Sequence, residues 1–230
     1  RVNPSDPGVP VTTTPTGSTS QTWNWIASSD ATSGVVQYLW RTMLGAVAGP
    51  SGIVAPDVTS AVTNLTQGIW DFFVKSVDAA GNESNESTSQ VAVDIEKPTT
   101  TDVGTDNLWH KDPVTVTLAC TDNLSGCMQI VYTTDGSDPT NSPTRVVVNG
   151  TSSSFTLSAE GIYTIKFYSI DLSGNLEDTK SAVNQVMIDT TPPTADAGLN
   201  QVQKTQFTQT GTASDLLSGV ASTVWSQVSG

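Results

Sequence analysis

The phrase Asp-x-x-Ser-Gly occurs three times in this chain, at residues 30–34, 122–126 and 215–219. The three aspartates are 92 and 93 residues apart. An aromatic residue follows each glycine by six positions, and these residues are Trp40, Tyr132 and Trp225. A motif that returns at a fixed period with its neighbours in place indicates a tandem array of small domains.

A second phrase keeps the same register. Gly-Ile followed by an aromatic residue, at 68–70 and 161–163, leads ten residues on to Asp-x-x-Gly-Asn at 78–82 and 171–175. The period therefore divides the chain into two complete repeats and the opening of a third. We predict domains at residues 1–97 and 98–192, and the N-terminal part of a third domain at residues 193–230.

The composition within each repeat predicts an all-β fold. Only 13% of the residues are charged, and short runs rich in Val, Ile, Thr and aromatic residues alternate with Gly, Pro, Asn and Asp clusters. The second repeat contains seven such runs, among them residues 114–120 and 161–170. Seven short strands in about 93 residues are typical of an immunoglobulin-like or fibronectin type III-like sandwich. We therefore expect tandem sandwiches in an elongated array.

Alternation along the strands assigns side chains to the core or to water. Trp70, Phe72 and Val74 share one face of their strand, which we expect to be buried, and Lys75 points the other way. The aromatic residue after each Asp-x-x-Ser-Gly motif stands where this class of sandwich has its buried strand-C aromatic residue. We therefore predict that Trp40, Tyr132 and Trp225 lie in the cores.

The net charge of −13 limits the partners of this chain. An acidic surface with nine scattered basic residues repels nucleic acid and anionic membranes, so neither is an expected partner. The sequence contains no run of 18 apolar residues, which is the pattern that would predict a membrane span. The expected partners are other protein subunits or cell-surface components, with a glycan as a further candidate.

The motifs resemble those of bacterial extracellular sandwich modules. The first repeat, with Tyr38-Leu-Trp40 and residues 77–82, resembles bacterial fibronectin type III modules. The second, with residues 118–127, 132–139 and 170–175, is similar to immunoglobulin-like modules related to the chitobiase C-terminal domain. The third, residues 195–198 and 225–230, resembles the start of a PKD-type domain. This resemblance implies an extracellular or cell-surface location and leaves the role open.

Cys120 and Cys127 are the only cysteines, and six residues separate them across the second Asp-x-x-Ser-Gly motif. We predict a disulfide, which implies an oxidising compartment. A zinc site would need further ligands, and His110 is the only histidine. A pair of free thiols is the remaining alternative.

Carboxylates are predicted to gather at one end of each sandwich, where the B–C and F–G loops meet the preceding linker. Three or four carboxylates at one point suit Ca²⁺, which prefers six to eight oxygen ligands. Turn chemistry is the alternative, because Asp and Asn also accept backbone N–H groups in tight turns. The candidate metal ligands are Asp94, Glu96, Asp122, Asp171 and Asn175 at the first junction, Asp30, Asp78 and Asn82 in the first repeat, and Asp189 and Asp215 at the second junction.

No catalytic constellation is present in the sequence. A nucleophilic triad needs a histidine beside Ser or Cys, and we expect His110 to be an exposed edge residue. The sequence therefore predicts no enzyme in this chain.

Three roles remain open. The first is a structural spacer of a secreted or surface protein, such as an adhesin stalk, a surface layer or a filament, with junctions stiffened by calcium. The second is a carbohydrate-binding accessory module of a secreted glycan-active enzyme, with Trp23, Trp25, Trp109 and Tyr38 as candidate platform residues. The third is a module that binds another protein by strand addition at an open edge.

Overall fold

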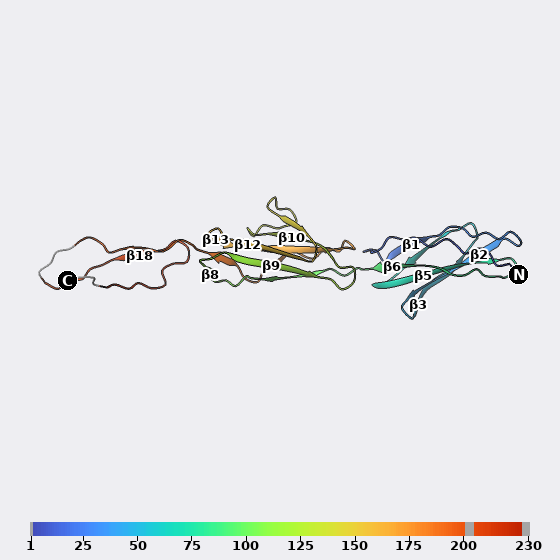
Figure 1. The fold of residues 1–230 in the computed structure, drawn as a ribbon, viewed down its shortest axis with the longest axis horizontal. Helices are drawn as coiled ribbons and strands as arrows, with labels where there is room; N and C mark the ends of the chain where they lie inside the picture. Colours follow the sequence, from blue (N-terminus) through green and yellow to red (C-terminus); the bar gives the residue numbers. More distant parts are fainter. Residues whose placement is uncertain (1, 201–204, 227–230) are drawn as a thin grey trace.

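The computed structural model describes residues 2–200 and 205–226, and those ranges contain no α-helix. Successive sets of strands follow one another along a single long axis, with the two termini at opposite ends (Figure 1). The prediction of all-β tandem sandwiches in an elongated array is confirmed. We refer to residues 2–97, 98–192 and 193–226 as the first, second and third modules. No helix that is long and apolar enough to cross a bilayer occurs in the described part of the chain.

The first module is built from a two-stranded and a four-stranded antiparallel sheet. The small sheet pairs β1 (Ser20–Asn24) with β4 (Ser60–Asn64). The large sheet has the order β3-β2-β5-β6, with β2 (Val35–Leu44), β3 (Val47–Val54), β5 (Gly68–Asp78) and β6 (Ser87–Val93).

The core of the first module is aromatic. Trp23 from the small sheet stacks on Phe72 from the large sheet, with ring centroids 4.5 Å apart, and both side chains are fully buried. Trp70 and Val74 are buried beside Phe72, as strand alternation predicts. Trp40 is partly buried and packs against the same cluster.

The second module contains three sheets. A sheet of order β12-β9-β7 faces one of order β11-β10-β14-β15, and a third has the order β13-β16-β8. The strands are β7 (Thr99–Val103), β8 (Trp109–His110), β9 (Val114–Thr121), β10 (Cys127–Thr133), β11 (Val146–Asn149), β12 (Ser152–Leu157), β13 (Gly161–Tyr163), β14 (Lys166–Asp171), β15 (Lys180–Ser181) and β16 (Val186–Ile188). The strand expected at 161–170 is thus divided into β13 and β14.

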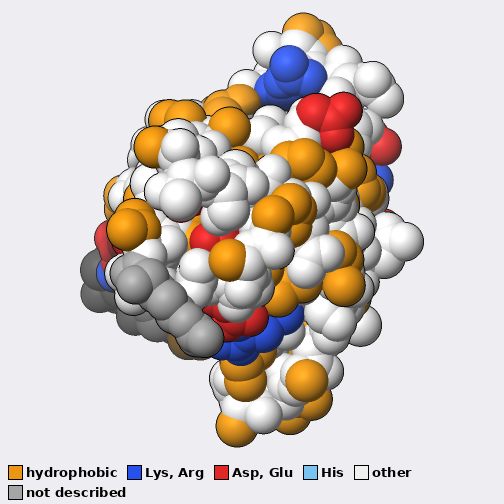
Figure 2. Space-filling view, turned by 90° about the vertical axis from the view of Figure 1, so that its right-hand side faces the viewer, with side chains coloured by type: hydrophobic (Ala, Val, Ile, Leu, Met, Phe, Trp, Pro, Cys, Tyr) orange, Lys and Arg blue, Asp and Glu red, His pale blue; other side chains and the backbone are white. Residues whose placement is uncertain are grey.

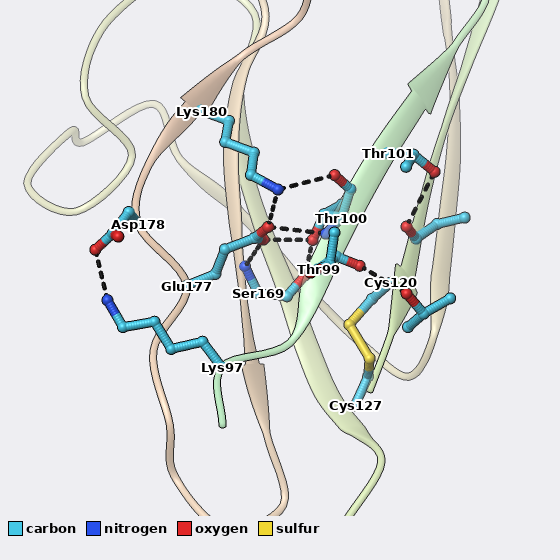
Figure 3. A network of polar contacts seen from close by, with 12 residues as sticks. Lys97, Thr99, Thr100, Thr101, Cys120, Cys127, Ser169, Glu177, Asp178 and Lys180 are labelled. Carbon is cyan, nitrogen blue, oxygen red and sulfur yellow. Dashed lines mark hydrogen bonds and ion pairs between the residues drawn. A yellow bond between two sulfur atoms is a disulfide. The ribbon is translucent and has the colours of Figure 1, made fainter. Parts of the chain in front are cut away.

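A buried glutamate joins two of these sheets (Figure 3). Glu177 is 5% exposed and accepts the backbone N–H groups of Thr100 on β7, at 2.8 Å, and of Ser169 on β14, at 3.1 Å. Lys180 forms an ion pair with the same carboxylate at 2.5 Å. The carboxylate therefore satisfies backbone groups where β7 and β14 belong to different sheets, and it closes that edge of the sandwich.

The third module shows one short antiparallel pair, β17 (Thr194–Asp196) with β18 (Thr212–Ser214). Trp225 is 57% exposed, so the prediction that it lies in a core is wrong. No second sheet covers it within residues 193–200 and 205–226. Residues 227–230, part of the motif that resembles a PKD-type domain, lie outside the described residues.

Candidate functional site: the junction of the first two modules

The Asp-x-x-Ser-Gly loop of the second module is a tight turn capped by its own aspartate. One carboxylate oxygen of Asp122, Oδ2, accepts the backbone N–H groups of Leu124 and Gly126, both at 3.2 Å. Gly126 has a φ of 85°, a backbone conformation that glycine adopts without a steric cost. The motif therefore needs aspartate and glycine for the turn, and it leaves the N–H group of Ser125 free to bind a residue outside the loop.

The loop at residues 171–175 lies directly beside this turn. Asp171 accepts the backbone N–H of Asn175 at 2.8 Å and its side-chain amide at 2.7 Å. The N–H of Leu172 donates to the carbonyl of Gly126 at 2.9 Å and so holds the two loops together. We call this pair of loops the pole of the second module. Loops 30–34 and 78–82 form the corresponding pole of the first module.

Asp94, in the linker, connects the two modules through its side chain. Its Oδ2 accepts the N–H of Ser125 in the second module at 2.8 Å, and its Oδ1 accepts the side-chain amide of Gln67 in the first module at 2.8 Å. Asp94 is fully buried. Burial raises the pKa of this carboxyl, but the hydrogen bonds from Ser125 and Gln67 outweigh burial and hold the pKa below its usual value. Asp94 is therefore ionised at neutral pH.

Two further residues of the first module complete the contact. The side-chain oxygen of Gln67, Oε1, accepts the N–H of Ile95 at 2.6 Å, which fixes the linker against the first module. A Cβ atom on Gly17 would lie 2.9 Å from the carbonyl oxygen of Ser173 in the pole, so only glycine fits there without a shift. Sequence reasoning missed both residues, because neither belongs to a repeated motif.

Three carboxylates converge at this junction. Asp94, Asp122 and Asp171 each offer an oxygen atom, and these atoms lie within 4.8 Å of one another. The second oxygen of Asp122, Oδ1, is buried and has no hydrogen-bond partner in the described part of the chain. The arrangement brings together three of the five residues that the sequence suggested for this junction.

The other two residues, Glu96 and Asn175, are not among these three carboxylates. Glu96 accepts the side-chain amide of Asn123, away from the three carboxylates. The amide of Asn175 donates both to Asp171 and to the backbone carbonyl of Asp94, at 2.8 Å for the latter, so Asn175 joins the pole to the linker.

The first module's pole is held by similar internal bonds, and no linker carboxylate takes part in them within the described residues. Asp78 accepts the N–H of Asn82 at 2.7 Å, the side-chain amide of Asn82 at 2.7 Å and the N–H of Ala80 at 2.9 Å. The hydrogen bonds from Asn82 outweigh burial and lower the pKa of Asp78. Asp30 accepts the N–H of Ser33 at 2.7 Å, and this bond lowers the pKa of Asp30.

The junction between the second and third modules repeats the linker contact. Asp189, the linker aspartate, accepts the N–H of Ser218 at 2.9 Å, and the bonds from Ser218 hold the pKa of Asp189 below its usual value. Asp215 caps its own turn by accepting the N–H of Gly219 at 2.8 Å. A cavity of about 440 Å³ between these modules is lined by Asp189, Asp215 and Glu160 together with Leu216 and Leu217.

The two cysteines close the loop that carries Asp122. Cys120 and Cys127 form a disulfide, with Cα atoms 6.3 Å apart, which confirms that prediction. Cys120 is the last residue but one of β9 and Cys127 begins β10, so the bond spans the base of the Asp-x-x-Ser-Gly turn. The disulfide thus restrains the same loop that binds the linker.

Three of the four candidate platform residues for a glycan are buried. Trp23 and Tyr38 are fully buried and Trp25 is 5% exposed. Trp109 on β8 is partly buried. The adjacent His110 lies on the edge strand of its sheet, as expected, but it is partly buried, and its Nε2 lies 3.0 Å from Asp106 Oδ1.

Comparisons with known proteins agree with the architecture. The family model for the chitobiase/β-hexosaminidase C-terminal domain matches residues 110–181. A search of curated protein sequences finds no match.

The similar solved structures share little sequence with this chain. A two-domain fibronectin type III segment of chicken tenascin is 14% identical, with a TM-score of 0.38, and the match covers 77% of this chain and 97% of the tenascin segment. The fibronectin(III)-like modules of Clostridium thermocellum CbhA are 16% identical, with a TM-score of 0.32, over 76% of this chain and 87% of theirs. The tetra-tandem repeat in the extending region of a large adhesion protein is 15% identical, with a TM-score of 0.36, over 87% of this chain and 52% of that one.

The resemblance of the second repeat to the chitobiase-type module is therefore confirmed, whereas the resemblance of the third to a PKD-type domain stays a prediction. The first two modules are all-β sandwiches in tandem, and residues 110–181 of the second are similar to the chitobiase/β-hexosaminidase C-terminal domain family.

Proposed function

We propose that this chain is a non-catalytic spacer of a secreted or cell-surface protein, whose junctions are fixed by linker aspartates and stiffened by Ca²⁺. The observation that carries the proposal is the side chain of Asp94, which binds Gln67 of one module and Ser125 of the next. A spacer has to hold its ends apart. A buried side chain that bonds both neighbours resists bending of the linker between them.

The acidic cluster supports calcium at this junction. Two oxygen ligands on one Ca²⁺, each about 2.4 Å from the ion, cannot lie more than about 5 Å apart. One oxygen atom from each of the three carboxylates satisfies that limit, since these atoms all lie within 4.8 Å of one another. Like charges this close repel one another, and a divalent cation would remove the repulsion. Asp122 Oδ1, which is buried and without a partner among the described residues, would gain a ligand bond.

Thermal unfolding of the full chain with calcium and with EDTA tests the metal. We expect a higher midpoint in calcium, since a ligand at one hundred times its Kd stabilises the folded state by about 2.7 kcal/mol. Asp122→Asn should abolish the shift. Asp57→Asn, at an exposed aspartate outside the cluster, should leave the shift unchanged. Equal midpoints with calcium and EDTA would exclude calcium at the junction.

Small-angle X-ray scattering of the same protein tests the spacer separately. A fixed junction predicts one extended shape, and Gln67→Ala should broaden the distribution of distances. A wild-type chain that already samples many bend angles, with and without calcium, would contradict the spacer.

An accessory role beside a glycan-active catalytic domain is the alternative, and the match of residues 110–181 to a family named after chitobiase and β-hexosaminidase favours it. Retention of the full chain on insoluble chitin would support this alternative. A chain that stays in solution would leave the spacer as the better account.

A further inference from the structure

The three Asp-x-x-Ser-Gly loops are equivalent in the backbone contact just before them, which is a strand pair in the second and third modules and a single hydrogen bond, from the N–H of Ser5 to the carbonyl of Ser29, in the first. In each module the residue before the motif aspartate pairs with the residue after a proline. The pairs are Ser29 with Ser5, Thr121 with Thr99, and Ser214 with Thr194, so that the equivalent prolines are Pro4, Pro98 and Pro193. The two linker aspartates, Asp94 and Asp189, stand four residues before the second and third of these prolines.

The serine of the motif donates to different acceptors in the three modules. The N–H groups of Ser125 and Ser218 donate to the linker aspartates, at 2.8 and 2.9 Å. The N–H of Ser33 donates instead to Asp30 of its own loop, at 2.7 Å. Within residues 2–200 and 205–226, no linker carboxylate bonds to Ser33. In the first module, where no linker aspartate contacts the serine, the serine N–H therefore donates to the aspartate of its own loop.

The rest of the first pole already matches the second. The N–H of Ala79 donates to the carbonyl of Gly34 at 3.2 Å, as Leu172 does to Gly126. Asp30 Oδ2 is buried and has no hydrogen-bond partner in the described part of the chain, as is true of Asp122 Oδ1. Figure 2 faces this end of the molecule, where charged side chains are few and scattered among polar and hydrophobic ones. The surface therefore offers the preformed turn at residues 30–34, in which the N–H of Ser33 is a donor that can change its acceptor.

We infer that the pole of the first module is a docking surface for another sandwich module joined ahead of Pro4, whose linker places an aspartate four residues before that proline. The incoming carboxylate would accept the N–H of Ser33, which would leave Asp30. The incoming carboxylate would also be the third at this pole, beside those of Asp30 and Asp78. The three together would then bind a cation in the same way as the first junction. That last step rests on the proposed function.

An extended chain tests the docking surface. A copy of residues 2–97 is fused to the full chain from Pro4 onward, so that Lys97 of the copy precedes Pro4 and the added Asp94 stands four residues before it. Isotope labelling is confined to the original chain, and the amide resonance of Ser33 is compared with that of the unextended protein. We expect the resonance to move in the fusion and to return when the added Asp94 is changed to Ala.

Two outcomes are distinguishable in the same spectra. A Ser33 resonance that is the same in all three proteins would overturn the docking surface. This conclusion requires that the added copy is folded, which the indole signal of its Trp23, labelled in a second sample, reports. The amide of Ser125 reports the existing junction independently. If the original Asp94→Ala leaves Ser125 unchanged, the proposed function fails, whatever Ser33 does.

Discussion

The first two modules share one fold but are stabilised by different means. The first relies on large aromatic rings, with Phe72 stacked on Trp23 of the opposite sheet and on Trp40 of its own sheet. The second has a smaller aromatic contact, Tyr132 on Phe155 at 4.3 Å, and adds a disulfide and the buried Glu177. Sandwiches of similar size can therefore differ in whether aromatic stacking or covalent and polar links between sheets and loops accompany the apolar core.

One position illustrates the exchange directly. Ser84 follows Ser76 by eight residues, and Glu177 follows Ser169 by the same number. Ser84 and Glu177 both accept the N–H of that preceding serine, at 3.0 and 3.1 Å. Only the glutamate is long enough to reach the opposite sheet as well. The same offset therefore supports a local bond in one module and a bond between sheets in the other.

The largest expected effect is the loss of an aromatic ring from the first module. Phe72→Ala should lower the free energy of unfolding of that module by about 3–5 kcal/mol, because it opens a cavity at a fully buried site. The matched change Phe155→Ala, at a partly buried ring in the second module, should cost less. Urea unfolding followed by tryptophan fluorescence measures both. Equal losses would contradict the difference between the cores.

Removal of the disulfide should have the next largest effect, and only in the second module. Cys120→Ser with Cys127→Ser should lower the stability of that module by about 2.5 kcal/mol in the chain-entropy account of a short loop. Calorimetry of the full chain should show one transition moving and the other unchanged. A reducing agent applied to the wild type is the control. If both transitions shift together, the disulfide stabilises both modules and not the second alone.

The smallest effect concerns the loop between β10 and β11, which the first module replaces with a short turn at Gly45. Hydrogen bonds from Ser137 and Thr144 lower the pKa of Asp135 to about 2. A lowered pKa stabilises the fold above the ordinary value of 3.8, and this contribution is lost as the pH falls towards 2. The midpoint of thermal unfolding of the Asp135→Asn variant should therefore lie below that of the wild type at pH 6, and the two midpoints should converge near pH 2. A gap that is constant across this range would exclude the charge as its cause.

Strand alternation and repeat spacing predicted much of the fold and part of the site. They placed Phe72 in the core and brought Asp122, Asp171 and Asp94 to one pole, since period and topology are encoded in local sequence. They failed for Glu177, because a glutamate in a polar loop carries no local sign of burial. They failed for Gly17 and Gln67 because contacts between modules depend on how the modules are placed relative to one another. Trp225 has the expected spacing but no covering sheet in the described residues.

The parallel pairing in the second module has a mechanical consequence. β8 lies near the start of this module and β16 near its end, and they run side by side with Trp109 opposite Met187 and His110 opposite Ile188. Tension on the ends of the array would pull these two strands in opposite directions along their length. Shear of this kind loads the neighbouring hydrogen bonds together, whereas unzipping would load them one at a time. The second module should therefore resist stretching more strongly than the small number of hydrogen bonds between β8 and β16 suggests.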